Sequence, residues 1–60
     1  MKLWIARDND NQLYCYYNKP VKMEHCFVGA QIAILAMTLL PDVTFENSPQ
    51  LVEIKLIKSL

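Results

Sequence analysis

Two short runs of aromatic and branched residues near the N-terminus constrain the fold of this chain more than any other feature. The runs are residues 3–6 (LWIA) and 13–17 (LYCYY), and the turn-forming cluster DNDN lies between them at residues 8–11. Aromatic and branched side chains fit a pleated sheet, whereas Asp and Asn are typical of turns. Residues 3–17 therefore predict a β-hairpin.

Both faces of the predicted hairpin carry apolar residues. Because side chains alternate across a strand, Leu3 and Ile5 share one face of the first strand, and Trp4 and Ala6 share the other. An isolated hairpin is marginally stable in water. We therefore expect that the rest of the chain covers both faces, or that one apolar face is left for another chain.

Residues 30–40 are compatible with either a helix or a strand. Four residues recur at helical spacing before Pro41, where a helix would have to end: Ile32, Leu35, Ala36 and Leu39. Ile32, Ile34 and Ala36 also alternate as they would in a buried strand, and periodicity alone does not separate these structures in a short apolar run. The helix is favoured because most residues between 30 and 40 are good helix formers.

The other expected elements are short strands. Residues 25–28 predict a strand stopped by Gly29, and residues 51–57 predict a C-terminal strand with Val52, Ile54 and Leu56 on one face. The predicted fold is thus α+β: a small, mainly antiparallel β-sheet with an N-terminal hairpin, one short helical element in the middle and a C-terminal strand. An all-β fold is the alternative.

The length of the chain bears on its assembly. Sixty residues predict one small domain, residues 1–60. A chain this short buries only about 60% of the surface that its unfolded form exposes. Since 53% of the residues are hydrophobic, we expect a homo-oligomer, with a two-fold dimer as the default. A compact monomer of modest stability is the alternative.

Charge and cysteine content limit the partners and the compartment. The formal net charge is zero and the basic residues are spread along the chain, which argues against a nucleic-acid partner. Two cysteines are too few for a disulfide framework. The N-terminus through Asp8 has no apolar region long enough for a secretory signal. No apolar run reaches the ~18 residues of a membrane span. We expect a cytoplasmic protein with reduced cysteines and no membrane association.

Several short motifs carry a resemblance to known sequences. They are LWIARD (3–8), LY (13–14), KP (19–20), PDVTFENSP (41–49) and VEIKL (52–56). On these motifs, which span most of its length, the chain resembles a group of short uncharacterised proteins from gut anaerobic bacteria and their mobile elements. The resemblance implies a complete, free-standing intracellular protein, and it transfers no functional residue.

No residue set predicts a catalytic or metal site. His25 and Cys26 are adjacent and Cys15 is distant, whereas zinc sites use close pairs and four ligands. The turn at residues 8–12 is similar to the start of a calcium loop, but Leu13 stands where that loop needs Gly. The chain also lacks a phosphate-binding glycine loop. We expect no metal, no cofactor, no catalytic residue and no enzymatic activity.

Three aromatic residues of the predicted hairpin are the interface candidates: Trp4, Tyr14 and Tyr16. Tyr and Trp are enriched where interfaces are energetically strong, although aromatic pairs also form sheet cores. The predicted function is a self-associating, non-enzymatic protein-interaction module that acts by binding another macromolecule. An unidentified protein is a possible partner, and the biological process is unknown. The alternative is a weak nucleic-acid-binding accessory protein, since folding could bring Arg7, Lys19 and Lys22 together.

Overall fold

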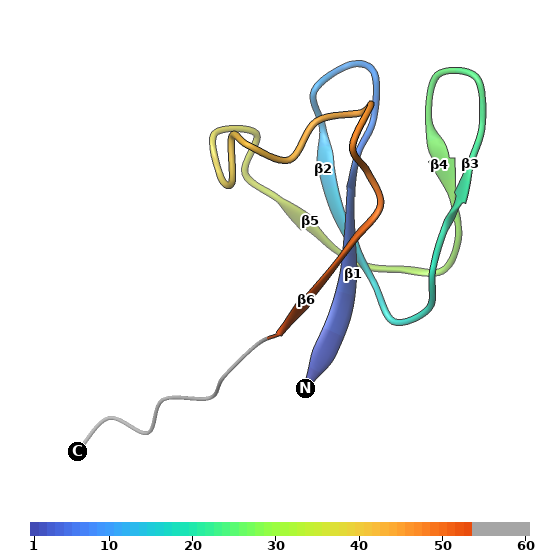
Figure 1. Cartoon of the computed structure of the whole chain (residues 1–60), viewed down its shortest axis with the longest axis vertical. Coiled ribbons are helices and arrows are strands. Elements are labelled where there is room, and N and C mark those ends of the chain that lie inside the picture. Colours follow the sequence, from blue (N-terminus) through green and yellow to red (C-terminus); the bar gives the residue numbers. More distant parts are fainter. Residues whose placement is uncertain (54–60) are drawn as a thin grey trace.

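The computed structural model describes residues 1–53, which form six β-strands and no helix (Figure 1). The strands are β1 (Lys2–Arg7), β2 (Leu13–Tyr16), β3 (Val21–Lys22), β4 (Phe27–Val28), β5 (Gln31–Leu35) and β6 (Gln50–Glu53). β5, β2, β1 and β6 form an antiparallel sheet in that order, and β3 and β4 form a separate two-stranded sheet. The predicted small antiparallel sheet is confirmed.

The predicted α+β fold is wrong, because residues 30–40 contain a strand instead of a helix. Gln31–Leu35 forms β5, which pairs antiparallel with β2. Residues 36–39 then make a turn, in which the Leu39 amide donates to the Ala36 carbonyl. A helix here would satisfy only its own backbone, whereas β5 also satisfies backbone groups of β2, and branched residues such as Ile34 suit a strand. The fold is all-β. In the described residues, no helix is long and apolar enough to cross a membrane.

The central strand β1 pairs on both of its sides. It is antiparallel to β2, with Trp4 opposite Tyr16, and antiparallel to β6, with Leu3 opposite Val52. The connection from β1 to β2 is closed by the Asp8 amide, which donates to the Gln12 carbonyl over 2.9 Å. The predicted C-terminal strand is described as far as Glu53. Its remaining positions, including Ile54 and Leu56, lie outside the described residues.

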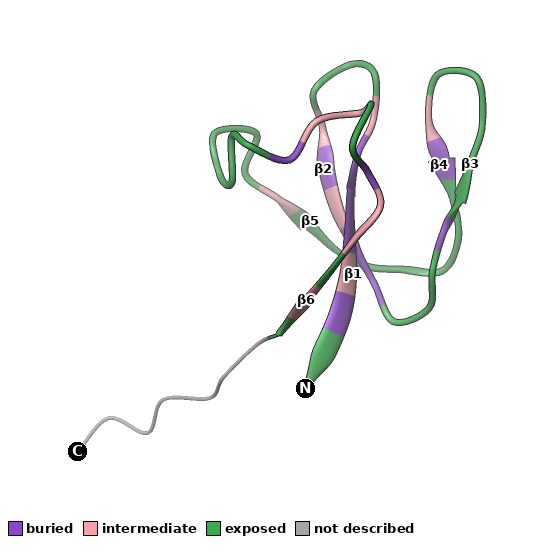
Figure 2. Cartoon of the chain, in the orientation of Figure 1, coloured by how far each residue is buried: buried purple, intermediate pink, exposed green. Residues whose placement is uncertain are grey.

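Apolar side chains form two buried clusters, one on each face of the four-stranded sheet. Figure 2 shows buried residues along β1, β2 and β4. One cluster contains Leu3, Ile5, Leu13, Cys15 and Val43, and the other contains Ala6, Tyr16 and Phe27. Val43 belongs to the loop between β5 and β6, and Phe27 belongs to β4. The rest of the chain thus covers both faces of the N-terminal strands.

The hairpin of β3 and β4 approaches the sheet closely at Gly29. A Cβ atom at Gly29 would lie 3.2 Å from Cδ2 of Tyr16 and 3.3 Å from Cα of Pro20. Both distances are shorter than an ordinary carbon contact. The missing side chain therefore lets the chain pass from β4 into β5 against the Tyr16 ring.

Candidate interaction surface

Arg7, at the end of β1, organises the loop that follows β5. Its side chain is only 6% exposed. A guanidinium has five N–H donors, and here each one meets a backbone carbonyl. The acceptors are Val43 for Nε, Asn11 and Met37 for Nη1, and Leu39 and Leu40 for Nη2. Four of these carbonyls belong to residues 37–43, so Arg7 fixes the path of that loop.

Ser48 provides a second attachment next to Arg7. The Arg7 backbone amide donates to Oγ of Ser48 over 3.0 Å, and this hydroxyl donates to the Thr44 carbonyl. Ser48 is 7% exposed. The loop between β5 and β6 is therefore held at both of its ends by the last residue of β1.

The carbonyls that Arg7 holds belong to residues with exposed apolar side chains. Met37 is 52% exposed, Leu39 47% and Leu40 43%. Leu40 also has a left-handed backbone, with φ of 52°, which is costly for a residue with a side chain. Arg7 thus draws these carbonyls inward and leaves the Met37, Leu39 and Leu40 side chains in solvent.

The same segment contains exposed residues of β5. Ile32 is 39% exposed and Ile34 is 67% exposed. Within residues 1–53, eleven large apolar side chains are exposed, and five of them fall between residues 31 and 40. We call these five the β5 surface: Ile32, Ile34, Met37, Leu39 and Leu40. No Asp, Glu, Lys or Arg occurs from residue 26 to residue 41. The segment that contains the β5 surface is therefore uncharged along the sequence.

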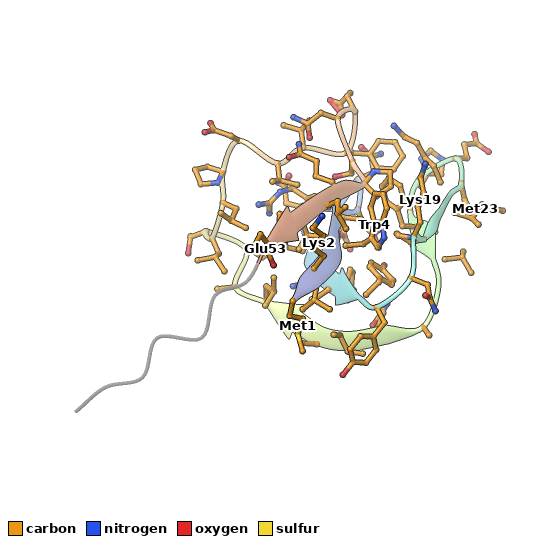
Figure 3. All side chains as sticks on the ribbon, turned by 60° about the horizontal axis from the view of Figure 1, so that its bottom comes forward. Met1, Lys2, Trp4, Lys19, Met23 and Glu53 are labelled. Atoms are coloured by element: carbon orange, nitrogen blue, oxygen red, sulfur yellow. The ribbon has the colours of Figure 1, made fainter. Side chains whose placement is uncertain are left out.

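β5 also forms one edge of the sheet. In the part of the chain that the structure describes, it pairs with β2 on one side and with no strand on the other. Natural edge strands are usually protected by charge, proline or distortion. The opposite edge, β6, carries Glu53, whose carboxylate lies 2.8 Å from the N-terminal amine of Met1 (Figure 3). β5 lacks such a charge, and its only irregularity is a bulge.

The bulge lies at the start of β5. Tyr16 is opposite Gln31 and Cys15 is opposite Ala33, so Ile32 is an additional residue without a partner on β2. The pairing is regular from Ala33 to Leu35. A bulge bends the strand locally, so the regular part of the free edge is this short stretch centred on Ile34.

The three predicted interface residues lie in different surroundings. Trp4 is half-buried and has the Lys19 ammonium 5.5 Å from its ring centroid (Figure 3). Tyr14 is half-buried and lies opposite Ile34 in the register, next to the β5 surface. Tyr16 is fully buried and forms part of the core. Tyr14 and Tyr16 are both paired with β5 residues, but Tyr14 is the one that lies opposite the regular part of that strand.

The Tyr16 hydroxyl is buried without a hydrogen-bond partner of regular geometry. Burial raises the pKa of Tyr16, and the negative charge of Asp8 raises it further. The Gln31 side chain is close enough to lower this pKa slightly, but it does not complete a regular hydrogen bond. The hydroxyl is thus a polar group that the core accommodates at a cost.

A pocket of about 460 Å³ lies between the β1–β2 turn and the loop after β5. Its lining includes Asp8, Asn11, Met37, Thr44 and Phe45. Burial raises the pKa of Asp8, while the Phe27 amide, which donates to Oδ1 over 3.0 Å, partly opposes this and nearby Asp10 adds to it. Because Arg7 has committed its donors to carbonyls, it contributes no hydrogen bond to an anion in this pocket.

The sequence candidates for metal binding do not come together. In residues 1–53, no three His, Cys, Asp or Glu side chains are grouped as they would be around a metal ion. His25 lies beside Asn9, with Nδ1 and Nδ2 3.5 Å apart, whereas Cys15 is in the core. Burial raises the pKa of the Cys15 thiol, which makes it a weaker nucleophile.

The basic residues that folding might have gathered are also separately engaged. Arg7 is buried against its carbonyls. Lys19 lies over Trp4, and Lys22 lies 4.6 Å from the Phe45 ring centroid and donates to the Glu46 carbonyl. The ammonium groups of Lys19 and Lys22 thus lie over different aromatic rings, Trp4 and Phe45.

The arrangement offers two means of binding another chain: backbone groups along a free strand edge and an apolar side-chain surface beside it. Sequence reasoning did not select Ile32 and Ile34 for this role, although the absence of charge between residues 26 and 41 was a usable signal. Comparison with protein-family models, with curated proteins and with solved structures finds no match for this chain.

Proposed function

We propose that this chain is a non-enzymatic protein-interaction module that binds an extended segment of another polypeptide at the free edge of β5. The observation that carries the proposal is an exposed edge strand without charge, followed in the sequence by the exposed side chains of Met37, Leu39 and Leu40. Addition of a strand to a sheet edge is a recurring mode of peptide recognition. Backbone hydrogen bonds supply affinity in this mode, and alternate side chains supply specificity.

The apolar contact is substantial but insufficient by itself. The five side chains of the β5 surface are 39% to 67% exposed. Full burial of such a side chain is worth about 1.5–3 kcal/mol, so covering the exposed half of all five contributes roughly 4–7 kcal/mol. Association costs about 4–15 kcal/mol. The added backbone hydrogen bonds must provide the surplus, and we expect a reversible complex.

Arg7 supports this function by ordering the loop before a partner arrives. Its guanidinium holds the carbonyls of Met37, Leu39 and Leu40. A surface that is already ordered pays less conformational entropy on binding. We therefore assign Arg7 the role of a positioning residue, which acts through the loop without contacting the partner.

The test is a titration of the isotopically labelled chain with a short, uncharged strand-forming peptide, followed by amide chemical shifts. The probe is a peptide of alternating Thr and Val, so that the result does not depend on this chain's own sequence. Saturable shifts confined to Gln31–Leu35 and the residues of β2 beside it support the proposal. Shifts elsewhere, or none at millimolar peptide, contradict it.

Matched variants sharpen this experiment. Ile34→Lys places a charge on the free edge and is expected to abolish peptide binding. Val28→Lys is the control, because Val28 is 55% exposed on β4, away from that edge. Equal binding by both variants would show that the peptide does not use β5.

A further inference from the structure

We infer that the segment bound at the β5 edge is β5 of a second copy of this chain, antiparallel to the first and related to it by a two-fold axis at Ile34. This inference rests on the proposed function and adds the identity of the partner. The distribution of charge, the register of β5 and the size of the exposed segment support it.

The distribution of charge favours β5 over β6 as the edge strand that pairs with a second copy. A two-fold axis places residues near it opposite the same residues of the other copy, so a charge there faces a like charge. β5 and the loop as far as residue 41 contain no charged residue, whereas β6 contains Glu53. β5 can therefore pair with itself without repulsion.

The register follows from the bulge. Since the regular part of β5 runs from Ala33 to Leu35, its midpoint is Ile34, which is also the most exposed large apolar side chain of the strand, at 67%. An axis at Ile34 sets Ile34 against Ile34 and Ala33 against Leu35. Pairs of branched side chains across antiparallel strands are favourable. Tyr14, beside Ile34 on β2, extends the apolar contact.

The exposed segment that contains β5 is comparable in relative size to the smallest stable interfaces. The smallest stable interfaces bury about 600 Å² on each partner, which is about one eighth of the 4574 Å² that this chain exposes. Residues 31–40 make up one sixth of the chain, and all of them except Leu35 are exposed. The segment is thus close in relative size to the share of the surface that such an interface needs. A domain of this size also has the most to gain from added burial.

Disulfide trapping tests the axis directly. In a background with Cys15→Ala and Cys26→Ser, Ile34→Cys places the two new thiols opposite each other, within the range for a disulfide. Under mild oxidation we expect a covalent dimer. Leu51→Cys is the matched control, because Leu51 is 48% exposed on the edge strand β6. Circular dichroism of both variants verifies that each one is folded.

Light scattering of the unmodified chain, with reductant, measures assembly from about 1 µM to 1 mM, the range of Kd that a small interface gives. A concentration-dependent dimer is expected. Ile34→Lys opposes two like charges at the axis and should raise Kd by at least ~100-fold, whereas Val28→Lys should change it less than ~threefold.

Each other result overturns the inference in its own way. Trapping at Leu51→Cys but not at Ile34→Cys would place the dimer at β6. A monomer at 1 mM that still binds the Thr-Val peptide at β5 would exclude the second copy while leaving the proposed function intact. A monomer that also fails to bind the peptide would remove both.

Discussion

Nε of Arg7 donates a hydrogen bond to the backbone carbonyl of Val43, 36 residues further along the chain. Four more carbonyls accept from the same guanidinium. Because a buried charge is tolerated only when its donors are satisfied, these carbonyls take the place of a carboxylate. The charge of Arg7 is thereby used to shape a loop.

Replacing Arg7 should destabilise the chain strongly. Lys has three donors, so Arg7→Lys leaves at least two of the five carbonyls without a partner and should cost about 2–4 kcal/mol. Urea titration followed by circular dichroism measures this. Arg7→Met should be largely unfolded, since a domain this small has only about 3–5 kcal/mol in total. The control is Lys2→Met, which removes the same charge from an exposed site and should cost less than about 0.5 kcal/mol. An Arg7→Lys variant as stable as wild type would contradict this account.

Removing the Tyr16 hydroxyl should stabilise the fold. The hydroxyl is buried without a regular partner, so Tyr16→Phe should raise the free energy of unfolding by about 1 kcal/mol. Tyr14→Phe, at a half-buried position, should change it by less than about 0.5 kcal/mol. Thermal unfolding of both variants measures the difference. If Tyr16→Phe instead lowered the free energy of unfolding by about 1 kcal/mol, this would indicate a hydrogen bond from Tyr16 to the Gln31 side chain.

Asp8 should make stability depend on pH. Burial raises the pKa of Asp8 in the folded chain above its ordinary value of 3.8, so the folded state holds this proton more tightly than the unfolded state. The stabilisation from protonated Asp8 is complete below pH 3.8 and is lost as pH rises through the folded pKa.

Asp8→Asn keeps the acceptor for the Phe27 amide and removes the ionisation. The free energy of unfolding of this variant, relative to that of wild type, should therefore be higher at pH 7 than at pH 3. Denaturant titrations of the two chains at both values provide the measurement. A difference between the chains that does not change with pH would show that the Asp8 pKa is unshifted.

The two cysteines should differ in reactivity. Cys15 is 6% exposed and its pKa is raised by burial, whereas Cys26 is only partly buried. A maleimide reagent should therefore modify Cys26 first, with Cys15 reacting at least ~100-fold more slowly and only through opening of the sheet. Mass spectrometry of the native chain over time, with a urea-unfolded sample as the control, measures the two rates. Equal rates in the native chain would place Cys15 at the surface.

Local patterns predicted the N-terminal part of the fold well. Strands 3–6 and 13–17 and the turn between them correspond to β1 and β2, because residue type and alternation are sufficient where strand neighbours are close in sequence. Residues 31–35 were misassigned, since their propensities favour a helix and their strand structure depends on pairing with β2, about twenty residues away.

The exposure of the β5 surface could not be predicted from the sequence, for a related reason. Tyr16 is an interface candidate in the sequence because it is aromatic. Its buried position against Phe27 and Gly29 results from the β3–β4 hairpin. Ile34 has no feature that separates a core strand from an edge strand. Only the strand order places β5 at the edge of the sheet.

The small antiparallel sheet with apolar residues on both faces follows from the residue types, because strand formers with apolar side chains at consecutive positions place such side chains on both faces. How the loop after β5 is held, and which apolar residues remain exposed, follows only from the folded arrangement. The physical reason lies in Arg7, whose five acceptors are backbone carbonyls. Every residue has such a carbonyl, so no pattern of residue types marks the ones that a buried guanidinium will bind.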